Sequence, residues 1–192
     1  AWEEGWVEPL QPGRSKGQSV GIIGAGPAGL TAAEYLRVAG YDVHVYDRHD
    51  RAGGLLTYGI PGFKLEKHVI MRRVQRLKDG GIHFHESFEV GKDATLDDLR
   101  DKHDAILIAT GVYQPRAIQM PGVGAPGVED ALDFLIASNR KSFGDSVPDF
   151  DNGRFNAKGK NVVVIGGGDP AGREIGEMPL PPRPRQYAGL AK

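Results

Sequence analysis

The chain of 192 residues contains no cysteine. Disulfide bonds, thiolate catalysis, zinc–thiolate centres and cysteine-ligated iron–sulfur clusters are therefore excluded within this chain. Whatever chemistry the chain supports must use a bound cofactor or the remaining side-chain types.

The chain also lacks an excess of charge and a long apolar run. Its 24 Lys and Arg residues nearly balance its 25 Asp and Glu residues, for a net charge of −1. This balance gives no electrostatic basis for binding nucleic acid or an anionic membrane. No apolar run is long enough to span a membrane, and we find no signal-peptide pattern. We therefore expect neither nucleic-acid nor membrane partners, and we predict a cytoplasmic protein.

Glycine is abundant, with 28 residues, and the most informative glycines lie in 19–48. A short apolar run there suits a buried parallel strand, and the pattern G-x-G-x-x-G follows it. Gly24 permits a tight turn, Gly26 lets a pyrophosphate approach bare backbone, and Gly29 lets a helix pack close to the sheet. A second strand ends at Asp47, where a dinucleotide site needs an acid for the ribose hydroxyls. We predict an α/β fold of the Rossmann type, with a parallel sheet and helices on both faces.

Two further segments point to the same site. The run 52–61 is too apolar for an exposed loop and too rich in glycine for a helix, which indicates backbone that approaches a large ligand. A tight structural loop is the alternative. The predicted strand 105–109 ends in Thr110-Gly111, a turn well placed at the carboxyl edge of a parallel sheet to touch a cofactor.

Charged and titratable side chains elsewhere give weaker signals. His83 and His85 alternate with apolar residues and should share one face of a strand. A metal site would need a third ligand that the sequence does not place, so we predict no metal site. Arg72 and Arg76 are expected on the solvated face of a helix over 65–79.

A second glycine motif follows the predicted strand 161–165. Gly166, Gly168 and Ala171 fit G-x-G-x-x-A, and two dinucleotide motifs suggest electron transfer between two cofactors. A helix could continue only to about Met178, because four prolines follow within 179–184. We expect the proline-rich end to be disordered or a departure in sequence, with a polyproline ligand for a peptide-binding domain as the alternative.

Several motifs together resemble the small (β) subunit family of bacterial NADPH-dependent glutamate synthases. They are VGIIGAGPAGL, VYDRHDRAGGLLTYGIPGFKLEKHV, FEVGKD, IATG and VVVIGGGD, and the resemblance covers residues 2–169. Close relatives share them, including the flavin part of dihydropyrimidine dehydrogenase and NADPH–ferredoxin oxidoreductase subunits. A non-catalytic, truncated nucleotide-binding fragment is another alternative. The glycine-rich loop 53–61 argues against an NAD-dependent dehydrogenase that uses the first motif alone.

The resemblance implies an enzyme of glutamate biosynthesis and ammonia assimilation. FAD would occupy the first motif and NADPH the second, and hydride would pass from the nicotinamide to the flavin. Electrons would then leave through iron–sulfur clusters, held outside this chain, to a glutamate synthase large subunit. Stacking of two rings requires no acid or base, so we predict no catalytic side chain.

The resemblance also assigns binding residues by position. Those implied for FAD are Gly24, Gly26, Pro27, Ala28, Gly29, Asp47, Gly54, Leu55, Lys64, Val90, Thr110 and Gly111. Those implied for NADPH are Gly166, Gly168, Asp169 and Ala171.

The expected organisation has five parts. A lead-in linker covers 1–17, the first segment of the FAD-binding domain covers 18–142, a linker covers 143–160, the start of the NAD(P)H-binding domain covers 161–178, and a proline-rich tail covers 179–192. The family's cluster-bearing N-terminal domain and most of its NADPH domain are not in this sequence. We therefore expect the chain by itself to bind FAD weakly or not at all.

Overall fold

The computed structural model describes residues 2–113, 119 and 121–165. The chain divides into two compact units, Ala1–Gln114 and Pro115–Lys192, which we describe separately. The expected first segment of the FAD-binding domain, 18–142, therefore includes residues of both units.

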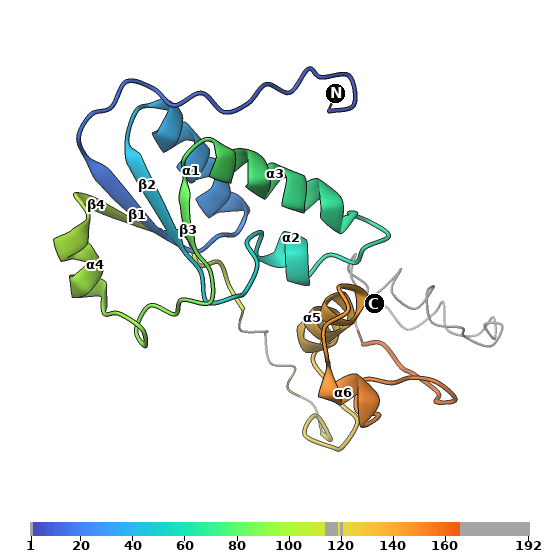
Figure 1. Cartoon of the computed structure of the whole chain (residues 1–192). Coiled ribbons are helices and arrows are strands. Elements are labelled where there is room, and N and C mark those ends of the chain that lie inside the picture. The colour runs from blue at the N-terminus through green and yellow to red at the C-terminus, as the bar shows by residue number, and fades with distance from the viewer. Residues whose placement is uncertain (1, 114–118, 120, 166–192) are drawn as a thin grey trace. The chain divides into compact units, whose positions relative to one another are not determined.

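The first unit alternates strands and helices along the chain (Figure 1). Its elements are β1 (Ser19–Ile23), α1 (Pro27–Val38), β2 (Asp42–Tyr46), α2 (Leu55–Tyr58), α3 (Lys67–Asp79), β3 (His83–His85), α4 (Leu96–Lys102) and β4 (Ala105–Ile108). Within the described residues, four parallel strands form one sheet in the order β3-β2-β1-β4. The predicted α/β fold with a parallel sheet is confirmed.

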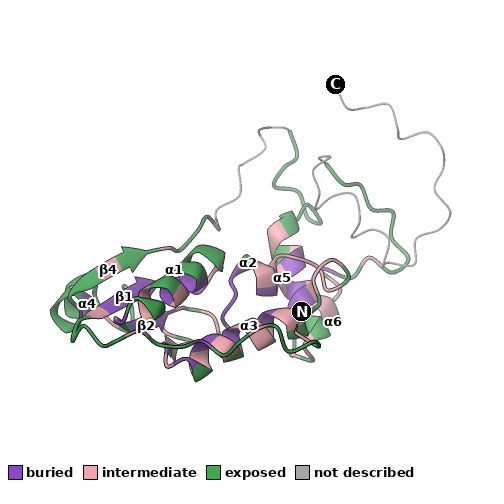
Figure 2. Cartoon of the chain, turned by 90° about the horizontal axis from the view of Figure 1, so that it is seen from above, coloured by how far each residue is buried: buried purple, intermediate pink, exposed green. Residues whose placement is uncertain are grey.

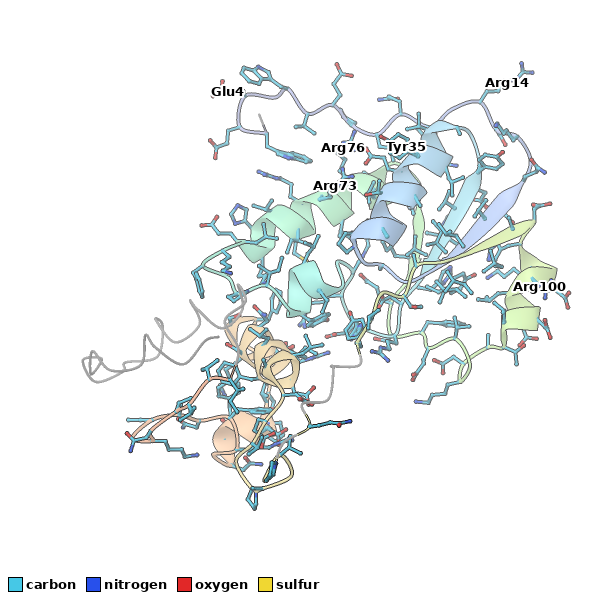
Figure 3. The ribbon with its side chains drawn as sticks, turned by 180° about the vertical axis from the view of Figure 1, so that it is seen from behind. Glu4, Arg14, Tyr35, Arg73, Arg76 and Arg100 are labelled. Carbon is cyan, nitrogen blue, oxygen red and sulfur yellow. The ribbon has the colours of Figure 1, made fainter. Side chains whose placement is uncertain are left out.

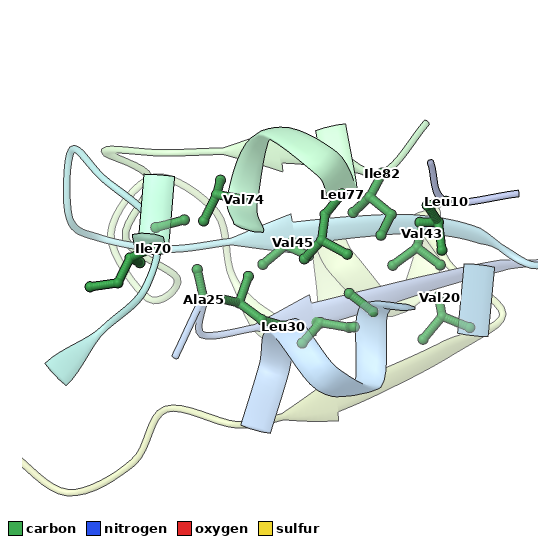
Figure 4. Packing of buried hydrophobic residues seen from close by; sticks show 13 residues of the cluster. Leu10, Val20, Ala25, Leu30, Val43, Val45, Ile70, Val74, Leu77 and Ile82 are labelled. Atoms are coloured by element: carbon green, nitrogen blue, oxygen red, sulfur yellow. The ribbon is translucent and has the colours of Figure 1, made fainter. Parts of the chain in front are cut away.

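The main apolar core lies on the face of the sheet covered by α1 and α3 (Figures 2 and 4). Alternate residues of β1 and β2 point into it, and Ile22 and Val43 have no exposed surface. Leu77 of α3 is likewise fully buried. Burial on this scale is the main favourable contribution to folding, so this face fixes how the two helices lie on the strands.

The opposite face of the sheet is covered more lightly. Ile23, Tyr46 and Leu99 form a small cluster there. Helix α4 begins with a capping box, in which the Thr95 hydroxyl accepts from the Asp98 N–H and the Asp98 carboxylate accepts from the Thr95 N–H. Such a cap fixes where a short helix begins.

Ion pairs join α1 to α3. Arg73 and Arg76 point from α3 toward α1 (Figure 3), and both pair with Glu34. Arg76 also donates to the Glu8 carbonyl at 2.7 Å. The expected solvated position of Arg76 is therefore wrong, because only 17% of its side chain is exposed.

The segment before β1 packs on the same core. Leu10 is 5% exposed, and a Cβ on Gly80 would come within 2.4 Å of its side chain. The Lys16 N–H donates to the Gly40 carbonyl at 3.0 Å. The expected linker 1–17 thus contributes a core residue to the first unit.

The second unit contains α5 (Ala131–Ser142) and α6 (Pro148–Asp151). Ala137, Val147 and Phe155 form its buried cluster, with Phe134 and Phe150 beside them. The expected linker 143–160 therefore includes a short helix and two buried side chains.

The predicted strand 161–165 is wrong, since these residues form no strand in the structure. A strand needs a hydrogen-bonded neighbour, and none of the described residues pairs with this run. Val163 is 84% exposed. Among the residues that the structure describes, no helix is long and apolar enough to cross a membrane.

Candidate functional site

The glycine turn, residues 24–29, leads from β1 into the first turn of α1. Its backbone is held in a conformation that other residues would not adopt. Gly24 has φ +111°, and a Cβ there would lie 2.4 Å from the Ala109 carbonyl oxygen. A Cβ on Gly29 would lie 1.9 Å from the Gly24 carbonyl oxygen. Both glycines are therefore required for the turn and the helix to pack together.

Gly26 differs from these two glycines because its surroundings are open. It precedes the first residue of α1 with φ −74°, and no described atom outside residues 25–27 lies within 4 Å of a Cβ built on it. Pro27 is the first helical residue, a position where its missing N–H costs nothing. The N–H groups of Ala28 and Gly29 have no partner within the helix. The turn thus offers a bare backbone and a positive helix end to an anion.

Asp47 follows β2 and reaches the glycine turn. Its Oδ2 accepts from the Ala25 N–H at 2.6 Å, and its Oδ1 accepts from the His49 N–H at 2.8 Å. The His49 Nδ1 lies 3.0 Å from the same Oδ1. Burial acts to raise the pKa of Asp47, but these hydrogen bonds outweigh it and hold that pKa below its ordinary value. The carboxylate is therefore ionised at neutral pH, with acceptor capacity left on Oδ2 for a hydroxyl.

The loop after β2 lies against the glycine turn. The Gly53 N–H donates to the Ala25 carbonyl at 2.8 Å. Gly54 has φ +54°, and a Cβ there would lie 2.8 Å from the Gly26 Cα. Residues 53–54 and the glycine turn therefore form one wall of the candidate site. The expectation that this loop approaches a ligand stays a prediction.

Two aromatic rings at this site were missed in the sequence. The Tyr113 ring lies 4.7 Å below the Arg48 guanidinium, and its centroid is 5.4 Å from that of His49. Burial and the charge of Asp47 raise the pKa of Tyr113, while Arg48 acts in the opposite direction. The only sequence signal was the position of Tyr113 shortly after the Thr110-Gly111 turn.

Lys67 holds the apolar loop in place, a role that the sequence did not suggest. Its ammonium donates to the Leu56 carbonyl at 3.1 Å and to the Ile60 carbonyl. Burial lowers the pKa of Lys67 to about 8. The predicted cofactor residue Lys64 lies between α2 and α3, half-buried, and its N–H donates to the Pro61 carbonyl at 3.0 Å.

The remaining predicted residues are more scattered. Leu55 begins α2 and is exposed, and Thr110 is exposed with its backbone beside Gly24. Gly111 has φ +68°. Val90 packs in the small cluster on the α4 face and forms a bridge with Ala94. The predicted NADPH residues lie outside the described part of the chain: Gly166, Gly168, Asp169 and Ala171.

Comparison with known proteins identifies the family of the chain. The family described as pyridine nucleotide-disulphide oxidoreductase matches residues 18–175. The chain is 61% identical over 171 residues to "Glutamate synthase [NADPH] small chain" of Azospirillum brasilense, covering 89% of this chain and 36% of that protein. It is 46% identical to the protein of the same name from Bacillus subtilis, covering 88% of this chain and 34% of the relative. The chain thus spans about a third of the length of these relatives, and the resemblance found in the sequence is confirmed.

A solved structure shares the fold. It is Mycobacterium tuberculosis FprA in complex with NADPH, with a TM-score of 0.58 and 24% identity over 64% of this chain and 29% of that one. At this identity the likeness extends to the fold alone.

Proposed function

The chain belongs to the pyridine nucleotide-disulphide oxidoreductase family, and on that premise we propose that residues 19–111 hold FAD in a flavin-dependent oxidoreductase. The observation that carries this proposal is the open backbone at Gly26, with the ionised Asp47 beside it. A pyrophosphate needs the first feature and an adenosine ribose needs the second.

The residues present fit this cofactor. Gly26 leaves room for an anion where any side chain would intrude, and the first turn of α1 supplies N–H donors. Asp47 is held at the turn by Ala25 and His49 and keeps a lone pair for a hydroxyl. Gly54 keeps the next loop close to Gly26.

When bound, FAD supplies acceptance of a hydride and release of single electrons. The role of the protein would be to bind and orient FAD. The glycine turn would hold the pyrophosphate, and Asp47 would hold the ribose. Thr110 and Gly111 would close the site and Leu55 would line its flavin side. We propose no acid or base among these residues.

The similarity to glutamate synthase small chains supports NADPH as the electron donor and a large subunit as the electron acceptor. We propose that Gly166, Gly168, Asp169 and Ala171 begin the NADPH site, and that the enzyme works in glutamate biosynthesis in the cytoplasm.

Titration with FAD tests the binding proposal. We expect saturable binding, followed by flavin fluorescence anisotropy, that Gly26→Ala weakens at least about tenfold, since a methyl group there blocks the phosphate. Wild-type circular dichroism in the variant would show that the fold is intact. Equal binding by the two proteins would contradict the proposal.

A further inference from the structure

Three potential metal ligands meet on the sheet face opposite the main core. Asp42 and His44 are two residues apart on β2, so their side chains point to the same face. His83 of β3 lies directly beside His44 in the parallel register. From the sequence, His83 and His85 lacked a third ligand; the sheet instead brings Asp42 and His44 beside His83.

The distances between these groups fit one ion. His44 Nε2 lies 3.2 Å from one carboxylate oxygen of Asp42, and His83 Nε2 lies 3.5 Å from the other. One ligand atom from each residue lies within 4.8 Å of the other two. With Zn²⁺ bond lengths of about 2.0–2.1 Å, neighbouring ligands of a tetrahedral site stand about 3.3 Å apart. Both separations from Asp42 are close to that value.

The environment of His44 favours coordination through Nε2. Its Nδ1 lies 3.1 Å from His85 Nε2, which orients the ring and leaves Nε2 directed at Asp42. The His85 ring in turn stacks on Tyr46, with centroids 4.4 Å apart. Metal-binding histidines are commonly fixed by such a partner on the second ring nitrogen.

Access and charge set the expected strength of binding. The side chains of Asp42 and His83 are 50% and 57% exposed, so an ion can enter from solvent. Neutral imidazole is the form of histidine that binds a metal. The Lys102 charge acts on His44 and opposes a bound cation. The stacked rings of His44 and His83, 24° from parallel, must also turn so that both lone pairs point to one ion.

We propose that Asp42, His44 and His83 form a binding site for a divalent transition metal, with Zn²⁺ as the best match and water completing the coordination. Two imidazoles and one carboxylate suit Zn²⁺, and not Mg²⁺ or Ca²⁺, which prefer oxygen ligands. The metal would tie the three-residue strand β3 to β2, at the edge of the sheet within the described residues. It would therefore stabilise the folded chain.

Calorimetric titration of the full chain with Zn²⁺ at pH 7.5 tests the site, together with Co²⁺ followed by its visible absorption. We expect one equivalent to bind in the micromolar range and Co²⁺ to give a four-coordinate spectrum. His83→Gln and Asp42→Asn should each weaken binding at least about tenfold, since even loss of an outer-shell partner costs that much.

His68→Gln is the matched control, because His68 also faces a carboxylate, that of Glu66 at 3.4 Å, on an exposed helix end. It should bind Zn²⁺ as the wild type does. His83 is exposed, so circular dichroism of the metal-free His83→Gln protein should be unchanged. Unaltered binding by folded His83→Gln, an equal loss in His68→Gln, or no binding by the wild type would overturn the proposal.

Discussion

The two faces of the sheet in the first unit use the same strands for different purposes. On the α1 and α3 face, residues such as Ile22, Val43 and Leu77 are fully buried in one apolar cluster. On the other face, histidines and Tyr46 stand among a few apolar side chains. Because successive strand residues point to opposite faces, β2 supplies valines to the core face and His44 and Tyr46 to the other face. We therefore expect the α1 and α3 face to contribute most of the folding stability, and the other face to carry the proposed metal ligands.

The largest effect should come from truncating the core face. Leu77→Ala leaves a cavity at a side chain with no exposed surface, and we expect it to lower the free energy of unfolding by about 2–5 kcal/mol. Ile106→Ala, at a partly buried position on the other face, should cost less. Urea unfolding of both variants measures the difference. Equal losses in the free energy of unfolding would contradict the contrast between the two faces.

The next effect concerns the glycine turn. Gly29→Ala should lower the free energy of unfolding by about 1–3 kcal/mol, because its methyl group overlaps the Gly24 carbonyl. Gly26→Ala should change it by less than about 0.5 kcal/mol, as its surroundings are open. Thermal and urea unfolding of the two variants test this pair. A destabilised Gly26→Ala protein would mean that Gly26, like Gly29, is required for the fold.

Asp47 should make stability depend on acid pH. Its folded-state pKa is lowered, so its stabilisation is present above the unfolded-state value of about 3.9 and is lost as pH falls toward the folded-state value. Asp47→Asn should cost about 1.5–3 kcal/mol at pH 7, the usual value for a hydrogen bond to a charged group.

That cost should shrink toward zero in acid. Unfolding at pH 7 and at successively lower pH, for both proteins, measures the change. A difference between wild type and Asp47→Asn that stays constant across this range would rule out the linkage.

The smallest effect is expected at the cap of α4. Thr95→Ala removes the hydroxyl that accepts from the Asp98 N–H and should cost about 1 kcal/mol. Thr95→Ser keeps the hydroxyl and should retain most of the stability. If the two substitutions destabilise the chain equally, the cap contributes nothing and the methyl group matters instead.

Local patterns predicted much of the first unit. The short apolar run and the glycine spacing after it predicted β1, α1 and β2, since each of these elements depends on residues close in sequence. Contacts between distant residues were beyond such patterns. Leu10 packs beside Gly80, Arg76 pairs with Glu34, and Tyr113 returns to His49. The pairing of β2 with β3, which places Asp42 beside His83, is also a contact between residues distant in sequence.

The predicted strand 161–165 failed for a related physical reason. Its apolar, β-branched sequence favours extended backbone, but a strand also requires a neighbour that supplies hydrogen bonds. None of the described residues does so here.

The most direct test of the account is where FAD contacts the chain. Backbone amide NMR shifts during titration with FAD can detect weak binding and locate it. We predict saturable shifts at Gly26, Ala28 and Gly29, with α4 unaffected, and loss of these shifts in Gly26→Ala. Absence of shifts in the glycine turn at millimolar FAD, or shifts confined to other segments, would contradict the proposal that this turn holds the cofactor.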